Sequence, residues 1–404
     1  MAMGGITTAG DMLFGSIDPE HEVAALEQVL EREGAPMRVV NVFDSRAFSN
    51  RARGIRAMGP PDQPIDFDAG VAAIEPWFAK GSDKVWYSRA VKFFADGAMF
   101  SQLMQMNAPG YADGHHGEWL MAPPVLKAGV RAFWNAGYTV HVHVNGDGGM
   151  DAVLDALQTA QDEKPRFDHR FHAHHVGFHA QAQTARLAAL GAHASVNPYY
   201  IHALADDYAR FGLGAERAAQ ITRCGSMLRE GMRVSFHSDF MMAPPEPLTL
   251  AWCAANRLTG SGKVVSPSER LTLMQALRGV TIDAAWGLRV EHEVGSIAAG
   301  KRADFCVLLD DPFELGADRL KDVRIAGTVF EGTPHMLAQP LASLHADPAA
   351  MSPSARPRGV SRRRSSTRYR PVAARCCGVA GDVCDIARQW RAWTAPQAAL
   401  QAAP

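Results

Sequence analysis

Short runs of β-branched and other apolar residues alternate with amphipathic stretches over the first 290 residues of the chain. Apolar runs bounded by turn residues predict strands, and the amphipathic stretches between them predict crossover helices. The pattern therefore indicates an α/β fold of parallel strands joined by helices. The predicted strands span residues 6–9, 37–44, 90–95, 138–145, 170–176, 192–197 and 232–237.

Four of these strands end near a side chain that can bind a metal or carry a proton: Lys92, His143, His175 and Asp239. The carboxyl ends of parallel strands share one face, where an α/β barrel assembles its chemistry. Such an ordered set is typical of a metal-dependent hydrolase barrel. No His-x-His pair occurs upstream of Lys92, so we interpret the chain as an enzyme without its beginning.

Lys92 lies within an apolar strand, Val91-Lys-Phe-Phe-Ala-Asp-Gly97, and allows two interpretations. Its stem can run along apolar surface while its amine pairs with Asp96. Alternatively, burial lowers the basicity of the amine, which then takes up carbon dioxide and bridges two metal ions as a carbamate.

Two predicted strands are rich in histidine. Alternation puts His141 and His143 on one face of their strand, and only His143 lies beside the turn where the strand ends. The next strand contains His172, His174 and His175. We interpret His143 and His175 as metal ligands, with hydrogen-bonded structural histidines or a solvent-facing cluster as the alternatives.

Asp239 follows the last predicted strand, in Phe236-His-Ser-Asp239. One interpretation is that its carboxylate caps the following turn. The other is that it holds a metal-bound water, accepts a proton from that water and passes it to a leaving nitrogen.

Composition restricts the setting. The net charge of the chain is −1, but its distribution is uneven. Residues 351–404 contain ten Arg and two Asp and so carry a net charge of about +8, which leaves a net charge of about −9 for residues 1–350. The six cysteines show neither a disulfide framework nor paired zinc-ligand spacing, which favours a reducing cytoplasm. We expect no signal peptide and no membrane span.

The tail is rich in Pro, Ala, Ser and Arg, a composition that predicts disorder. Binding of nucleic acid through Arg362–Arg364 is the alternative, and we do not expect it. The expected partner is a small-molecule substrate, and the sequence leaves the oligomeric state open.

Several motifs together resemble the amidohydrolase superfamily, in the branch called amidohydrolase family 3, whose relatives include N-substituted formamide deformylase-like proteins. The motifs that support this resemblance are 91–97, 141–147, the His175 strand, 237–239, 271–285 and 294–304. The resemblance implies a TIM-type (β/α)8 barrel, incomplete because it lacks its first strand. It also implies that residues 102–118, with His115 and His116, form a loop over the barrel mouth, where these histidines contact either substrate or solvent.

The resemblance further implies a role for each site residue. Lys92 is the carbamylated bridging lysine, His143 and His175 are metal ligands, and Asp239 is both a ligand and the general base. The metal is one or two divalent ions; zinc is preferred, and iron or manganese suit the ligands nearly as well.

We therefore predict three parts: a barrel over 1–290, a partial β-sandwich over 291–338, and a disordered tail over 339–404. The predicted function is metal-dependent hydrolysis of a non-peptide carbon–nitrogen bond, amide-like or formamide-like. The alternative is a catalytically impaired barrel fragment that only binds a ligand or partner. A truncated or shifted reading frame is our hypothesis for the unusual ends.

Overall fold

The computed structural model describes residues 1–54, 59–341 and 343. The tail that is predicted to be disordered spans residues 339–404. Residues 342 and 344–404 of this tail lie outside the described part of the chain. Among the described residues, no helix is both long and apolar enough to cross a bilayer.

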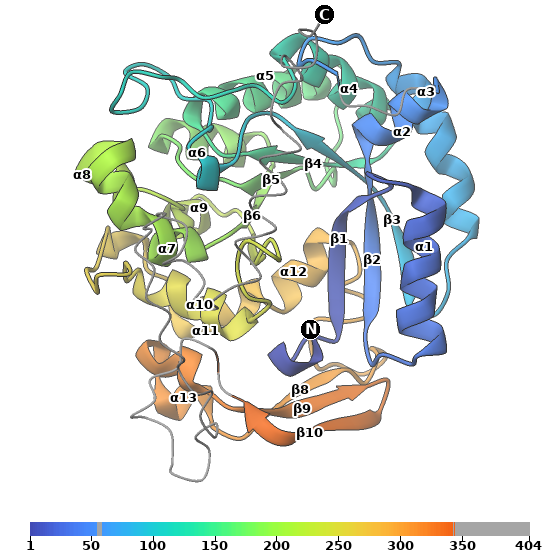
Figure 1. Ribbon diagram of the computed structural model, residues 1–404, viewed down its shortest axis with the longest axis vertical. Helices are drawn as coiled ribbons and strands as arrows, with labels where there is room; N and C mark the ends of the chain where they lie inside the picture. The colour runs from blue at the N-terminus through green and yellow to red at the C-terminus, as the bar shows by residue number, and fades with distance from the viewer. Residues whose placement is uncertain (55–58, 342, 344–404) are drawn as a thin grey trace, which may run out of the picture. The chain divides into compact units, whose positions relative to one another are not determined.

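Within the described part of the chain, seven parallel strands form one curved sheet, in the same order in space as along the chain (Figure 1). They are β1 (Thr8–Phe14), β2 (Arg38–Asp44), β3 (Val85–Phe94), β4 (Thr139–Val144), β5 (His172–His175), β6 (His193–Val196) and β7 (Val234–Phe236). This is the predicted α/β architecture of an incomplete TIM-type barrel, with seven strands where a closed barrel of this type has eight.

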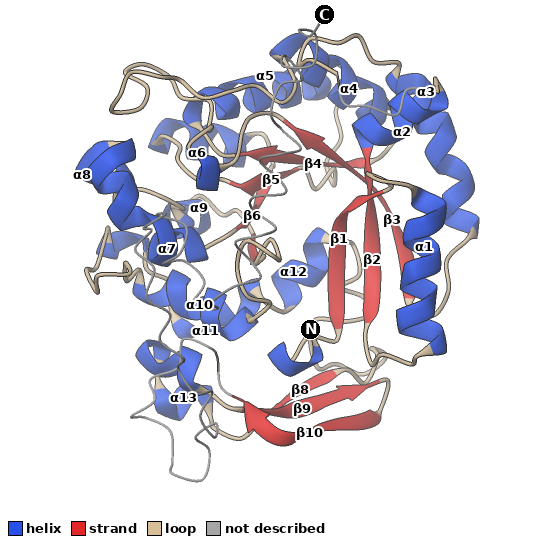
Figure 2. Cartoon of the chain, viewed as in Figure 1, coloured by secondary structure: helices blue, strands red, loops and turns tan. Residues whose placement is uncertain are grey.

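Helices connect successive strands and cover the outer side of the curve (Figure 2). The α-helices are α1 (Pro19–Glu27), α2 (Ser45–Ala52), α3 (Phe67–Ile74), α4 (Pro123–Asn135), α5 (Asp147–Glu163), α6 (Gln181–Ala189), α7 (Tyr199–Asp207), α8 (Gly214–Ala218), α9 (Cys224–Arg229), α10 (Pro247–Asn256), α11 (Leu273–Gly279), α12 (Ile282–Gly287) and α13 (Pro312–Leu315). Short 3₁₀ or π segments are η1 (Ala2–Gly4), η2 (Gln28–Arg32), η3 (Glu75–Ala79), η4 (Met99–Ser101), η5 (Tyr208–Gly212), η6 (Pro267–Glu269) and η7 (Ala317–Asp322).

Local chemistry explains where these helices begin and end. The Asp18 carboxylate accepts hydrogen bonds from the first free backbone N–H groups of α1, and Asp44 does the same for α2. After η2, which extends α1, Gly34 takes a φ of +73°, in the left-handed region that favours glycine. The glycine therefore ends this helical segment.

Side-chain alternation on β3 separates the core from the site. Val91 and Phe93 are fully buried, and the Phe93 ring packs 5.7 Å from Phe133 of α4. Because neighbours on a strand point to opposite faces, Lys92 points to the inner side of the curve. The strand begins at Val85, five residues before the predicted start, because residues 85–87 pair with β2.

A second, antiparallel sheet follows the barrel strands. It has the order β10–β9–β8, from β8 (Phe305–Leu308), β9 (Ile325–Phe330) and β10 (Thr333–Leu341). This sheet corresponds to the predicted partial β-sandwich, while the predicted boundaries at residues 290 and 338 stay a prediction.

A buried arginine joins the two sheets near the start of β2. The Arg38 guanidinium, fully buried, donates hydrogen bonds to Asp304 and, at 2.7 Å, to Glu331. It also lies 4.8 Å from the ring centres of Trp86 and Phe330. The charge is thus paired with carboxylates and flanked by aromatic rings, which compensates for its removal from water.

A buried carboxylate, Asp96, organises the carboxyl ends of β3 and β4. It accepts hydrogen bonds from the backbone N–H groups of Asn145 (2.8 Å), Gly146 (2.7 Å) and Gln105 (2.9 Å). The loop after β3 and the start of α5 are therefore tied to one side chain. Burial raises the pKa of Asp96 to about 7, and the three amide hydrogen bonds oppose that rise.

Replacing Arg38 tests the connection between the sheets. We expect Arg38→Met to lower the free energy of unfolding by about 3–5 kcal/mol, because it leaves the Asp304 carboxylate buried without its cation. Urea denaturation followed by circular dichroism measures this loss. As a control, Arg53→Met removes the exposed pair with Asp66 and costs less than about 1 kcal/mol. Equal losses in the two variants would contradict the role of Arg38.

Asp96 gives a pH dependence of stability with a defined sign. The pKa of Asp96 is higher in the folded than in the unfolded protein, so the folded state binds more protons between about pH 4 and 7. The contribution of Asp96 to stability therefore falls as the pH rises through that range. We expect the stability of the parent relative to Asp96→Asn to fall by on the order of 3 kcal/mol from pH 4 to pH 7.5. Urea titrations at several pH values measure the difference, and a constant difference would contradict the raised pKa.

Candidate functional site

The parallel register brings the predicted site residues to one edge of the sheet. Phe94 pairs with His143, and Val144 with His175, so that the ends of β3, β4 and β5 are level. The positive charge of Lys92 contributes to the pKa shifts of His143, His175 and Asp239. Lys92 therefore lies within electrostatic reach of each of the other three residues.

Several polar groups crowd around one nitrogen of His175. Its Nδ1 lies 2.9 Å from Nε2 of His237, 3.4 Å from Oη of Tyr200 and 3.9 Å from Oδ2 of Asp239. The His143 ring lies 4.5 Å from the His175 ring. A ring nitrogen has one lone pair or one hydrogen, so it cannot satisfy three groups at once.

Backbone geometry places His175 in this position. Strict alternation would put His174 and His175 on opposite faces of β5. His175 instead takes a φ of +71° and Val176 a φ of +49°, which ends the alternation. Asp239 is also left-handed, with a φ of +52°. Such conformations cost on the order of 1–3 kcal/mol each and are concentrated at functional sites.

Lys92 is held by histidines. Its side chain is almost entirely buried, and Nζ lies 2.8 Å from Nδ1 of His174, whose Nε2 lies 2.8 Å from Nδ1 of His141. The alternative interpretation, in which Lys92 pairs with Asp96, is wrong, because the Asp96 carboxylate bonds to backbone N–H groups at the adjacent strand ends. Burial lowers the pKa of Lys92 to about 7, so a substantial fraction of the amine is neutral near neutral pH.

Burial also keeps the imidazoles neutral. It lowers the pKa of His143 and of His237 to about 3, and that of His175 well below its usual value. A neutral imidazole has a free lone pair for a metal or a hydrogen-bond donor. Burial raises the pKa of Asp239, and the charge of Lys92 opposes that rise.

These donors fit a divalent metal in their chemistry. Neutral imidazole and carboxylate are ligands that zinc prefers. A cation placed among the groups around His175 Nδ1 would relieve their competition for that atom. Among residues 1–54, 59–341 and 343, however, no three His, Cys, Asp or Glu side chains form a group that could hold an ion.

The loop after β3 uses its histidines for its own structure. The His115 ring stacks on Tyr111 at 4.1 Å, and its Nε2 lies 2.8 Å from the backbone oxygen of Gln102. His116 Nδ1 lies 2.9 Å from the backbone oxygen of Met106. These contacts favour a structural role over the substrate contact that we considered from the sequence.

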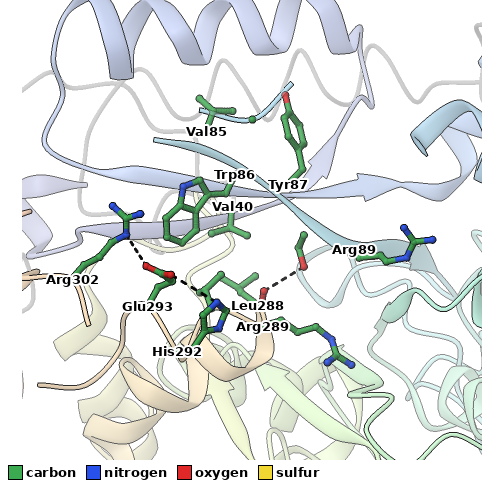
Figure 3. A pocket seen from close by; sticks show the side chains of 13 residues that line it. Val40, Val85, Trp86, Tyr87, Arg89, Leu288, Arg289, His292, Glu293 and Arg302 are labelled. Carbon is green, nitrogen blue, oxygen red and sulfur yellow. Dashed lines mark hydrogen bonds and ion pairs between the residues drawn. The ribbon is translucent and has the colours of Figure 1, made fainter. Parts of the chain in front are cut away.

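A separate pocket of about 450 Å³ opens beside the amino-terminal half of β3 (Figure 3). Ser88 lines it, and Lys92 lies four residues further toward the opposite end of the strand. Inside the pocket, Glu293 accepts a 3.0 Å hydrogen bond from Arg302 and lies 4.0 Å from His292. Since these charges already pair with one another, the strand ends remain the better candidate site.

Sequence reasoning missed several members of the site. Three side chains that contact the predicted residues were not assigned to it: His174, Tyr200 and His237. A fourth, His141, contacts His174. The position of His237, two residues before Asp239, was an available signal for that residue. Tyr200 lies on a helix after β6, where no strand-end rule applies.

Comparison with known proteins gives the family. A sequence profile of the amidohydrolase family matches residues 1–335. The chain is 29% identical over 248 residues to N-substituted formamide deformylase of Arthrobacter pascens, covering 60% of this chain and 44% of that protein. It is 30% identical over 226 residues to protein LONG AFTER FAR-RED 3 of Arabidopsis thaliana, covering 55% of this chain and 38% of that protein.

A solved structure agrees with the fold. An uncharacterized metal-dependent hydrolase from Pyrococcus furiosus superposes with a TM-score of 0.54 and 23% identity, over 73% of this chain and 54% of that one. The chain spans less than half the length of the two sequence relatives. The match over residues 1–335 confirms the resemblance carried by the motifs, and the chain belongs to the amidohydrolase family, in the branch called amidohydrolase family 3.

Proposed function

We propose that this chain forms the barrel of a metal-dependent amidohydrolase that cleaves a non-peptide carbon–nitrogen bond, amide-like or formamide-like, in a small molecule. The observation that carries the proposal is the crowding of His237, Tyr200 and Asp239 around a single nitrogen of His175. Buried polar groups that compete for one partner are better satisfied when a cation or a substrate oxygen lies among them. The similarity to a formamide deformylase supports the bond type.

In this proposal the metal is held by Lys92, as a carbamate, and by His143, His175 and Asp239. The carbamate requires a neutral amine, and the lowered pKa of Lys92 provides one. A bound divalent ion lowers the pKa of a coordinated water and polarises a carbonyl. Zinc suits the ligands best, as one or two ions, with iron or manganese as close substitutes.

Asp239 is the proposed general base. Its side chain is 45% exposed, so solvent and substrate can reach it from the open side of the strand ends. The raised pKa brings the carboxylate closer to the range in which it accepts a proton from water and then returns it to the leaving nitrogen. Protonation of that nitrogen is needed because an amide anion is a poor leaving group.

One observation favours a second candidate function, a barrel that binds ligands without catalysis. Among the described residues, no three His, Cys, Asp or Glu side chains form a group that could hold a metal. A site of that kind would hold an ion weakly, and hydrolysis would be slow or absent.

Metal binding distinguishes the proposed metal site from a cluster of histidines with a purely structural role. We expect the purified chain to bind about one zinc ion, and His175→Ala to weaken binding by at least tenfold, because a direct ligand is removed. Calorimetric titration and elemental analysis measure affinity and stoichiometry. His179→Ala is the matched control, since His179 is equally buried but bonds to Thr184 outside the cluster. Folded parent protein without any bound metal would exclude the proposal.

Hydrolysis tests the role of Asp239. We expect zinc-loaded protein to release amine from at least one member of a panel of N-formyl and N-acyl amines. Asp239→Asn should lower kcat by about 10²–10⁴, because it removes the general base. Product release is followed with an amine-reactive fluorophore. Metal binding without turnover of any compound by the parent would support the ligand-binding alternative.

A further inference from the structure

The hydroxyl group of Tyr200 is buried beside the proposed reaction centre. Tyr200 is the second residue of α7 and is 2% exposed. Its Oη lies 3.4 Å from Nδ1 of His175, and its ring packs edge-on against Phe100 with centroids 5.4 Å apart. The helix therefore fixes a phenol that points from an apolar layer into the polar cluster.

The hydrogen bond of Tyr200 to His175 is long and has a competitor. His237 Nε2 is closer to the same nitrogen, at 2.9 Å, and takes precedence for the one position that this nitrogen offers. The Tyr200 hydroxyl is thus a donor whose present partner is easily exchanged.

Tyr200 and Asp239 flank a common point. Oη of Tyr200 and Oδ2 of Asp239 lie 3.4 and 3.9 Å from His175 Nδ1, so the two oxygens are separated by no more than the sum of those distances. A hydroxyl donor and the proposed general base therefore lie beside the same ring nitrogen, so that a carbonyl bound next to this nitrogen would be within reach of both.

The surroundings of Tyr200 strengthen such a contact. The sulfur atoms of Met99 and Met104 lie against Gly177, two residues beyond His175, each 3.0 Å from where a Cβ of Gly177 would be. Both methionines belong with Tyr200 to an apolar cluster beside the strand ends. A hydrogen bond in such a water-poor setting is worth more than one in solvent, and a fixed donor needs no reorganisation during the reaction.

We propose that Tyr200 is a further catalytic residue, whose hydroxyl donates a hydrogen bond to the oxygen of the scissile carbonyl as its carbon becomes tetrahedral. Tyr200 forms and breaks no covalent bond and keeps its proton. This inference rests on the proposed hydrolysis of an amide-like substrate, and it adds a protein donor to the groups that stabilise the developing oxyanion.

The matched pair Tyr200→Phe and Tyr208→Phe tests it. Both variants delete one buried phenol oxygen from the same helical segment, but the Tyr208 hydroxyl donates to the backbone oxygen of Met99, 2.6 Å away. In zinc-loaded protein, we expect Tyr200→Phe to lower kcat by about 10²-fold or more, with KM and zinc affinity changed by less than about threefold. Tyr208→Phe should keep the kcat of the parent, even if its thermal stability falls.

A thioamide version of the same substrate tests the hydrogen bond directly. If Tyr200 had only a structural role, the ratio of parent to Tyr200→Phe rates would be the same for the amide and the thioamide. Sulfur accepts a weaker hydrogen bond than oxygen, so the ratio of parent to Tyr200→Phe rates should shrink toward one for the thioamide. If Tyr200→Phe does not fold, a folded Tyr200→Trp protein takes its place in the test. The indole N–H is a hydrogen-bond donor, but it is displaced from the position of Oη. Tyr200→Trp should therefore recover little of the rate advantage that the parent shows with the amide over the thioamide.

The outcomes separate the two proposals. A folded Tyr200→Phe protein with the kcat of an active parent overturns the role of Tyr200 and leaves the hydrolase intact. An equal loss of rate with amide and thioamide also overturns it. A parent that neither binds zinc nor hydrolyses any compound defeats the proposed function, and the role of Tyr200 is lost with it.

Discussion

Desolvation of the strand ends is the constraint on which the rest of the site depends. Lys92 and the imidazoles of β4 and β5 are buried in the curve of a parallel sheet, where a positive charge costs far more than in water. The protein meets that cost by lowering their pKa values until the groups are neutral. Neutral amines and imidazoles are nucleophilic and metal-binding, so the burial that threatens stability also creates the reactive state.

The neutral groups form two sets that share the strand ends. In one, Lys92 and His174 form a chain with His141, which fixes the amine. In the other, His175 is the centre, and its neighbours compete for one nitrogen. The first set is satisfied apart from Nε2 of His141, which has no partner among the described residues. In the second set, several groups share that one nitrogen, and a ligand placed among them would give each group a partner of its own.

The sequence was sufficient for the fold because the fold follows from local patterns. The strand predicted over 138–145 is β4, and the strand predicted over 192–197 is β6, since runs of β-branched residues between turn residues allow few other structures. The same logic placed His143 and Asp239 at strand ends. It could not give the left-handed φ of His175, because that depends on the packing around the end of β5 rather than on the residue itself. It also missed Tyr200, whose position depends on how α7 returns over the sheet.

The proposed site residues are divided between inner and outer strands of the described sheet. Strands β1 and β7 are the outer strands among the described residues, and an outer strand leaves one row of backbone groups without a sheet partner. Lys92 is on β3, two strands in from β1, and β3 to β7 form an unbroken ladder that includes the other ligand-bearing strands. On the β1 side, Arg38 anchors the start of β2 to the antiparallel sheet. Lys92 and the histidines of β4 and β5 therefore lie in the paired interior of the sheet, whereas His237 and Asp239 follow β7, an outer strand of the described sheet.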